Sequence, residues 1–201
     1  TLDYADDASG VAVVTVRGTD DAGAFVEDTF TVTVSAVNDP PVLIAALPDL
    51  TVDEDATPSS IDVSAAFTDT DILTDGDSLT YSIAGIGGDA VFDATSVSGS
   101  SVELVYAAEA NGVATVTVRA TDSGGAFVED DFEVTVNAVN DAPYVAGAVP
   151  SGSFPEDTAT GIVDMSGVFD DVDLTREGDN LSILVSGVAD PGGYIAGAAM
   201  N

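Results

Sequence analysis

The side chains of this chain that could do chemistry are carboxylates and amides that recur at one spacing. Asp69-x-Asp71 recurs 102 residues later as Asp171-x-Asp173. An extended loop of this kind can direct two carboxylates toward one ion, and calcium takes about six to eight oxygen ligands. Magnesium fits less well because its tighter octahedron retains waters. The spacing therefore indicates a hard-cation site, present in two copies.

Four more polar elements recur in the same register. They are a Glu-Asp pair, an Asp in a Thr-Asp turn, an acidic stretch that follows a tyrosine, and an Asn-Asp pair before proline. Their positions are Glu54-Asp55 and Glu156-Asp157, Asp20 and Asp122, the stretches after Tyr4 and Tyr106, and Asn38-Asp39 and Asn140-Asp141. One such element is usually a solvated turn, but five elements held in two copies weaken that interpretation. Nearby acidic residues either complete a site or form an acidic turn; they are Asp75, Asp77, Glu177 and Asp179.

Composition limits the classes of function. The chain has 36 acidic and three basic residues and a net charge of −33, which disfavours nucleic acid and anionic membranes as partners. Such a charge destabilises the compact state unless cations neutralise it. Either a solvated acidic coat or a set of cation ligands would explain it. Without His, Cys or Lys, only a carboxylate pair could do acid–base work, so we do not expect an enzyme.

The polar elements must be positioned by a repeated module. GVAVVTVRGTDDAGAFVEDTF (10–30) recurs as GVATVTVRATDSGGAFVEDDF (112–132), and a period of this length predicts tandem globular domains. Ala114, Val116, Val118 and Ala120 alternate with polar residues, which is typical of a strand with one buried face.

The other strands are short and separated by Gly, Asp and Ser clusters. A hairpin is expected at Ser123-Gly124-Gly125. Phe132, Val134 and Val136 define the strand after it, and the further expected strands are 41–45, 60–65, 78–84, 90–92 and 102–106. About seven strands in roughly a hundred residues predict an all-β fold, a seven-stranded Greek-key β-sandwich of immunoglobulin-like architecture.

Proline-containing linkers after Asn38-Asp39 and Asn140-Asp141 set the predicted domain boundaries. Residues 1–40 would be the C-terminal part of one domain, 41–142 a complete domain, and 143–201 the N-terminal part of a third. The chain then either is a window of a longer repeat protein or joins its neighbours head to tail, with 1–40 of one chain complementing 143–201 of another. No stretch approaches the ~20 apolar residues of a membrane span, and no signal peptide opens the chain.

The motifs together resemble a known family. LDYADDASG, the linker Asn-Asp-x-x-Pro, the Glu-Asp start, the Asp-x-Asp loop and the Leu79–Ile83 strand are similar to the cadherin-like repeats of large bacterial extracellular adhesins. This resemblance implies tandem cadherin-like sandwiches at the cell surface, with Ca²⁺ bound between successive domains.

The resemblance also implies the ligands of two junctions. The first set is Asp3, Asn38, Asp39, Asp69, Asp71 and Asp122; the second is Glu54, Asn140, Asp141, Asp171 and Asp173, with Asp20 of a neighbouring chain. Some family positions are not acidic here. The acidic residue before the linker is replaced by Ala36 and Ala138, and the Asp of Leu-Asp-Tyr becomes Val105. We therefore expect fewer ions at each junction or weaker binding.

The resulting interpretation is a calcium-rigidified segment of an extracellular repeat protein that serves as an adhesive or structural stalk. Its partners would be neighbouring repeats of the same protein, either within a longer chain or by head-to-tail self-assembly, and a cell-surface protein or polysaccharide. The alternative is a calcium-dependent polysaccharide-binding module. The absence of Trp makes that alternative weaker, because sugar rings usually stack on aromatic side chains.

Overall fold

The computed structural model describes residues 1–157, 160–174, 178–193, 195 and 197–199. It divides into two compact units, Thr1–Asn137 and Ala138–Asn201, and each is described by itself. The predicted boundaries at residues 40 and 142 remain predictions.

The fold is all-β, as the sequence predicts. The strands are β1 (Gly10–Thr19), β2 (Phe25–Val34), β3 (Val42–Leu43), β4 (Leu50–Asp53), β5 (Ser59–Asp62), β6 (Phe67–Thr68), β7 (Thr80–Gly88), β8 (Phe92–Ser98), β9 (Ser101–Tyr106), β10 (Gly112–Thr121), β11 (Phe127–Asn137), β12 (Tyr144–Val145) and β13 (Phe169–Asp170). The described helices are short: α1 (Asp71–Thr74) and the 3-10 turn η1 (Val172–Leu174).

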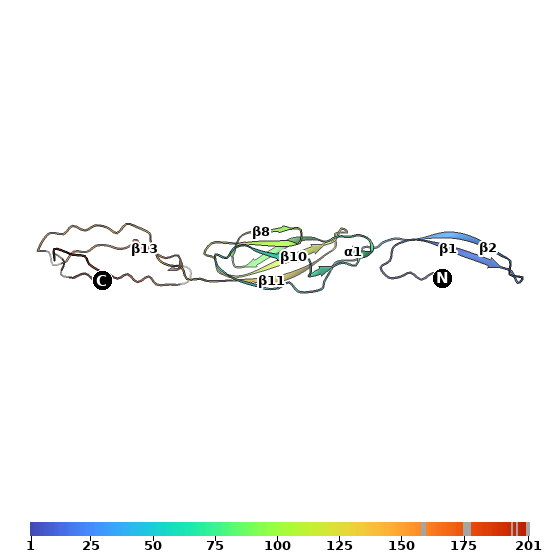
Figure 1. Ribbon diagram of the computed structural model, residues 1–201, viewed down its shortest axis with the longest axis horizontal. Helices are drawn as coiled ribbons and strands as arrows, with labels where there is room; N and C mark the ends of the chain where they lie inside the picture. The colour runs from blue at the N-terminus through green and yellow to red at the C-terminus, as the bar shows by residue number, and fades with distance from the viewer. Residues whose placement is uncertain (158–159, 175–177, 194, 196, 200–201) are drawn as a thin grey trace. The chain divides into compact units, whose positions relative to one another are not determined.

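Residues 38–137 form a β-sandwich. One sheet has the order β4-β11-β10-β7, and the facing sheet has the order β5-β9-β8. Figure 1 labels β10 and β11 of the first sheet and β8 of the second. The connections β4–β5, β7–β8 and β9–β10 each cross from one sheet to the other, which gives the Greek-key order of an immunoglobulin-like sandwich. The short pair β3–β6 lies outside these two sheets. The predicted seven-stranded sandwich is therefore confirmed.

The core follows from the alternation of apolar residues along β10 and β11. Ala114, Val116, Val118 and Ala120 are fully buried, and the polar residues between them face outward. The same holds for Phe132, Val134 and Val136 on β11; they pack with Leu47, Val63, Phe67, Val91, Val102, Leu104 and Tyr106. Burial of each valine, leucine or phenylalanine of this core stabilises the fold by about 1.5–3 kcal/mol relative to exposure.

Three strands differ from the prediction: β8, β4 and the two-residue β6, which was not predicted. The strand expected at 90–92 instead begins at Phe92 and runs to Ser98, and a register shift between Phe92 and Ala94 disturbs the alternation of its side chains. β4 was not predicted at all. It pairs in parallel with β11, residue Leu50 opposite Val134, and such a long-range pairing leaves little trace in a four-residue segment.

The β1–β2 hairpin forms a two-stranded sheet of its own. It repeats the register of β10–β11: Arg17 lies opposite Glu27 as Arg119 lies opposite Glu129. Most of its apolar side chains are nevertheless exposed. Tyr4 is 61% exposed, whereas the matching Tyr106 is 8% exposed and packs in the core. Tyr4 therefore does not pack as Tyr106 does, because within the described part of the chain no sheet covers the hairpin.

In the unit that follows residue 137, strands are described only at β12 and β13, which pair with each other. They match β3 and β6 in the 102-residue register. No helix in the described part of the chain is long and apolar enough to cross a membrane.

Candidate metal site

Three carboxylates meet at one end of the sandwich of residues 38–137. Asp69 follows β6, Asp71 begins α1, and Asp77 lies in the loop before β7. One oxygen of each lies within 4.8 Å of the others. Asp69 and Asp71 are buried, at 4% and 5% exposure. Because like charges repel at this distance, the cluster needs either a proton or a cation.

Local hydrogen bonds orient these carboxylates but do not reach all of their oxygens. The Asp71 amide donates to Asp69 Oδ1 (2.8 Å), and the amides of Ser78 and Ser123 donate to Asp77 Oδ1 (2.6 and 3.1 Å). Within the described structure, the buried Oδ2 atoms of Asp69 and Asp77 have no hydrogen-bond partner. Buried polar atoms are rarely left so, and two anionic oxygens in one cluster fit a bound cation.

The linker before the sandwich runs against this cluster. The Asp39 amide donates to Asp71 Oδ2 (2.7 Å), and Asn38 Nδ2 donates to Asp122 Oδ2 (3.0 Å) and to the Asp39 carbonyl (3.0 Å). Gly124 permits this approach, because a Cβ there would lie 2.3 Å from Asn38 Oδ1. The linker therefore adds the Asp39 carboxylate and the Asn38 amide to the oxygens of this region.

Two carboxyl groups of this region have shifted pKa values. Desolvation and then the carboxylates of Asp71, Asp7 and Asp69 raise the pKa of Asp39. Hydrogen bonds from Ser123 and Ser78 lower the pKa of Asp77 and keep it ionised.

The described arginines do not offset this charge. Arg17 pairs with Glu27 and Arg119 with Glu129, each at 2.7 Å. Arg176 lies outside the described residues, as does Glu177. In the described part of the chain, no basic side chain neutralises the Asp69–Asp71–Asp77 cluster.

The donor set fits calcium. Carboxylate and amide oxygens are the ligands of hard cations, and calcium accepts six to eight of them in flexible geometry. Asp69, Asp71 and Asp77 would hold the ion, with Asp39 and Asn38 beside them. A bound cation would satisfy the two unpartnered oxygens and cancel the repulsion at once.

The second copy of the loop repeats the local geometry within residues 138–201. The Asp141 amide donates to Asp173 Oδ2 (2.7 Å), the Asp173 amide to Asp171 Oδ1 (3.1 Å), and Asn140 Nδ2 to the Asp141 carbonyl (2.6 Å). Asp171 and Asp173 are buried. Both linkers thus hold their Asp-x-Asp loops by the same hydrogen bonds.

The structure does not bring every expected ligand into these groups. Asp3 is exposed, and no described hydrogen bond or ion pair joins it to the cluster. Asp20 is exposed and accepts the amides of Ala22 and Ala24 in its own turn (both 2.9 Å). Glu54 is buried, and its amide donates to the Asn137 carbonyl (2.8 Å). The roles of these three residues as ligands remain predictions.

Two residues near the cluster were not among the expected ligands. Asp77 completes the group with Asp69 and Asp71, although the sequence equally allowed an acidic turn there. Asp7 acts on Asp39 through its charge. The spacing Asp75-x-Asp77 was the available signal for Asp77, but only the fold shows that the chain after α1 turns back toward Asp69.

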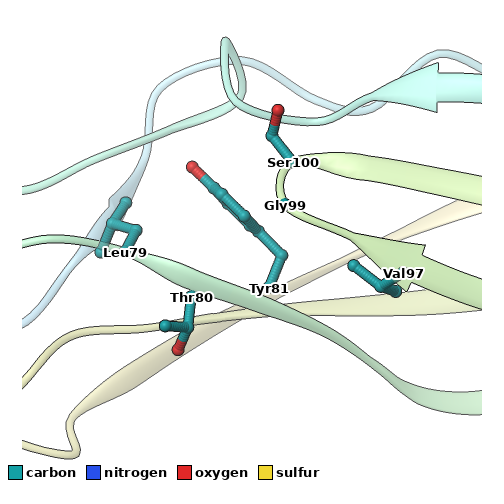
Figure 2. Close-up of a pocket in the computed structure, with 6 residues that line it drawn as sticks. All are labelled: Leu79, Thr80, Tyr81, Val97, Gly99 and Ser100. Atoms are coloured by element: carbon teal, nitrogen blue, oxygen red, sulfur yellow. The ribbon is translucent and has the colours of Figure 1, made fainter.

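A pocket of about 470 Å³ lies between the edge strands of the two sheets. Its lining comes from the start of β7 and from the β8–β9 turn: Leu79, Thr80, Tyr81, Val97, Gly99 and Ser100. Figure 2 shows the Tyr81 ring rising between Leu79 and the Gly99–Ser100 turn. Burial and then the charge of Asp62 raise the pKa of Tyr81, so its hydroxyl stays protonated at neutral pH.

Solved structures with a similar course of the chain include extracellular cadherin repeats. The protocadherin gamma B4 extracellular domain is 21% identical with a TM-score of 0.48, over 66% of this chain and 23% of that one. Domains 1–4 of protocadherin gamma B7 are 21% identical with a TM-score of 0.47, over 80% and 40%. An endo-fucoidan hydrolase of glycoside hydrolase family 107 is 17% identical with a TM-score of 0.35, over 67% and 20%. The chain thus spans less than half the length of each.

No curated protein matches the chain. A protein family does match, and its bounds coincide with the sandwich described above. Residues 38–137 match the bacterial Ig domain, from the linker asparagine to the last residue of β11. This sandwich therefore belongs to the bacterial Ig domain family.

Proposed function

We propose that this chain is a calcium-rigidified segment of an extracellular bacterial repeat protein, which acts as an adhesive or structural stalk and has no catalytic role. The observation that carries the proposal is the cluster of Asp69, Asp71 and Asp77, with its two unpartnered buried oxygens. The hydrogen bond from the Asp39 amide to Asp71 ties that cluster to the linker. An ion bound there would fix the direction in which the linker leaves the domain.

The physical mechanism is linkage. Calcium that binds the folded junction and not the unfolded chain adds stability as its concentration exceeds the dissociation constant, by about 2.7 kcal/mol at a hundredfold excess. It also removes the repulsion among carboxylates that would otherwise loosen the linker. We expect a stiff array with calcium and a flexible one without it.

Small-angle X-ray scattering with calcium and with chelator tests the stiffening. The expected result is a larger radius of gyration with calcium, lost on chelation. Asp69→Asn should remove most of the calcium response, because it removes one of the three clustered carboxylates, together with one of the two unpartnered anionic oxygens. The matched control is Asp93→Asn, an exposed carboxylate on β8 that should leave the response intact. A radius of gyration that is the same with calcium and with chelator would refute the proposal.

The pocket beside Tyr81 supports a second candidate, polysaccharide binding, because an aromatic ring lines it. Affinity electrophoresis in gels that contain acidic and neutral polysaccharides would detect such binding. Retardation that Tyr81→Ala abolishes would support this candidate. Equal mobility in all gels would remove it.

A further inference from the structure

We propose that the linker before the sandwich is held by an anchor that needs no ion, formed by Asn38 and the turn of residues 122–126 between β10 and β11. In this anchor Asp122 is a hydrogen-bond acceptor and not a cation ligand, and Gly124 is the position that admits the linker. This role goes beyond the proposed function, because it holds the linker without calcium. Only the effect of the anchor on calcium binding rests on the proposed function.

Both carboxylate oxygens of Asp122 have a hydrogen-bond donor. Oδ1 accepts the Ala126 amide (2.8 Å), and Oδ2 accepts Asn38 Nδ2 (3.0 Å). Asp122 is buried, but it does not belong to the group of three carboxylates that forms the candidate metal site. That group leaves two buried oxygens without a partner in the described structure. Asp122 leaves none, so it needs no cation to complete its hydrogen bonds.

Asn38 suits this acceptor because it is a neutral donor. Its Nδ2 carries two hydrogens, of which one reaches Asp122 Oδ2 and the other the Asp39 carbonyl, each at 3.0 Å. A hydrogen bond to a carboxylate is stronger than one between neutral groups, and an amide is not repelled by the carboxylates around it. The anchor can therefore hold residue 38 even where repulsion loosens the acidic side chains nearby.

The turn that receives Asn38 forms without the linker. The Asp122 amide donates to the Ala126 carbonyl (3.0 Å), and the Gly125 amide donates to the Asp122 carbonyl (3.3 Å). The turn of residues 20–24 between β1 and β2 makes the same two hydrogen bonds (2.9 and 3.1 Å). No described hydrogen bond joins a linker to that turn. The acceptor site for Asn38 is thus a property of the hairpin itself.

Gly124 lets the linker reach this turn. A Cβ at Gly124 would overlap the amide group of Asn38, whereas the matching residue of the other turn is Ala22. Gly124 does not have a positive φ, so the backbone would accept alanine, and it is the approach of Asn38 that requires glycine. Gly124 is therefore a positioning residue for the linker.

The anchor adjoins the candidate metal site at two points. The Ser123 amide donates to Asp77 Oδ1 (3.1 Å), and the Asp39 amide donates to Asp71 Oδ2 (2.7 Å). Each of these amides belongs to the residue that directly follows one half of the anchor in the sequence. The anchor thus places Asp39 and helps to orient Asp77 before an ion arrives, and preorganisation of this kind tightens binding.

Relaxation measurements by nuclear magnetic resonance on the full chain in chelator supply the first test. We expect an order parameter of about 0.85 for the Asn38 backbone amide, as in rigid strands, and a value below about 0.6 in Gly124→Ala. Gly124→Ala should fold, because the other turn already has Ala22 at this position. The matched control is Gly87→Ala on β7, where a Cβ would meet nothing within 4 Å. Order at Asn38 that appears only with calcium, or equal results for the two variants, would overturn the proposal.

Calcium titration by calorimetry tests the link between the anchor and the metal site. Gly124→Ala should weaken calcium binding about tenfold in the natural sequence, because the linker is no longer placed beforehand. It should have no effect in an Asn38→Ala background, where its methyl group has no amide to displace. Equal losses in both backgrounds would overturn the link. An ordered Asn38 amide in chelator, in a chain that binds no calcium, would support the anchor and refute the proposed calcium function.

Discussion

The hairpins β1–β2 and β10–β11 have nearly the same sequence and register but opposite surroundings. Both place an arginine guanidinium over a phenylalanine ring, at 4.1 Å for Arg17 and Phe25 and at 4.0 Å for Arg119 and Phe127. Contacts that need only the hairpin itself are therefore equal in the two copies. Contacts that need the other strands of a sandwich exist only for β10–β11. Local sequence decides the pairing of these strands, and distant segments decide whether their faces are buried.

Truncation of the equivalent phenylalanines should separate the two hairpins most strongly. Phe132→Ala removes a core ring and should destabilise residues 38–137 by about 3–5 kcal/mol. Phe30→Ala should change that stability by less than about 0.5 kcal/mol, because its ring is half exposed. Urea unfolding followed by circular dichroism, at a concentration where the chain is monomeric, measures both. Equal losses would mean that the hairpins share one environment.

The turn aspartates should differ less. Asp122 is 5% exposed and accepts hydrogen bonds from Ala126 and Asn38, so Asp122→Ala should cost about 1–3 kcal/mol. Asp20→Ala loses only exposed hydrogen bonds within its own turn and should cost well below half of that. The same urea experiment applies. A larger cost at Asp20 would contradict the view that the linker contact carries the difference.

The arginines should not differ at all. Arg17→Ala and Arg119→Ala each remove a half-exposed ion pair at 2.7 Å and a stacked ring, and each should cost less than about 1 kcal/mol. The difference between the two losses, from thermal melts of matched samples, should lie within the error of measurement. A clearly larger loss at Arg119 would show that the surrounding sandwich strengthens even this surface contact.

Much of the fold could be predicted from the sequence because alternation is a local signal. Val116, Val118 and Phe132 lie in the core as their period of two indicates. β4 escaped prediction because its identity as a strand depends on a parallel partner far along the chain. β8 was misplaced because a register shift disturbs its alternation. The exposure of β1–β2 could not be predicted, because nearly the same residues are buried in β10–β11.

The candidate site, like the fold, could be predicted only in part. Repetition of Asp69-x-Asp71 and of the Asn38-Asp39 linker marked them as a group, and the structure brings them together through Asp39 and Asp71. Asp77 joins them because the chain turns back after α1, and its own spacing did not specify that turn. The unpartnered oxygens of Asp69 and Asp77 are a property of the folded arrangement and have no counterpart in the sequence.

Calcium titration by calorimetry, with thermal melts of the same samples, tests the central claim most directly. We expect saturable binding to the chain and a rise in the melting temperature of residues 38–137 of about 10 °C at a hundredfold excess over the dissociation constant. Asp69→Asn should abolish most of both effects, and Asp93→Asn should leave them unchanged. No heat of binding and an unchanged melting temperature would contradict the account.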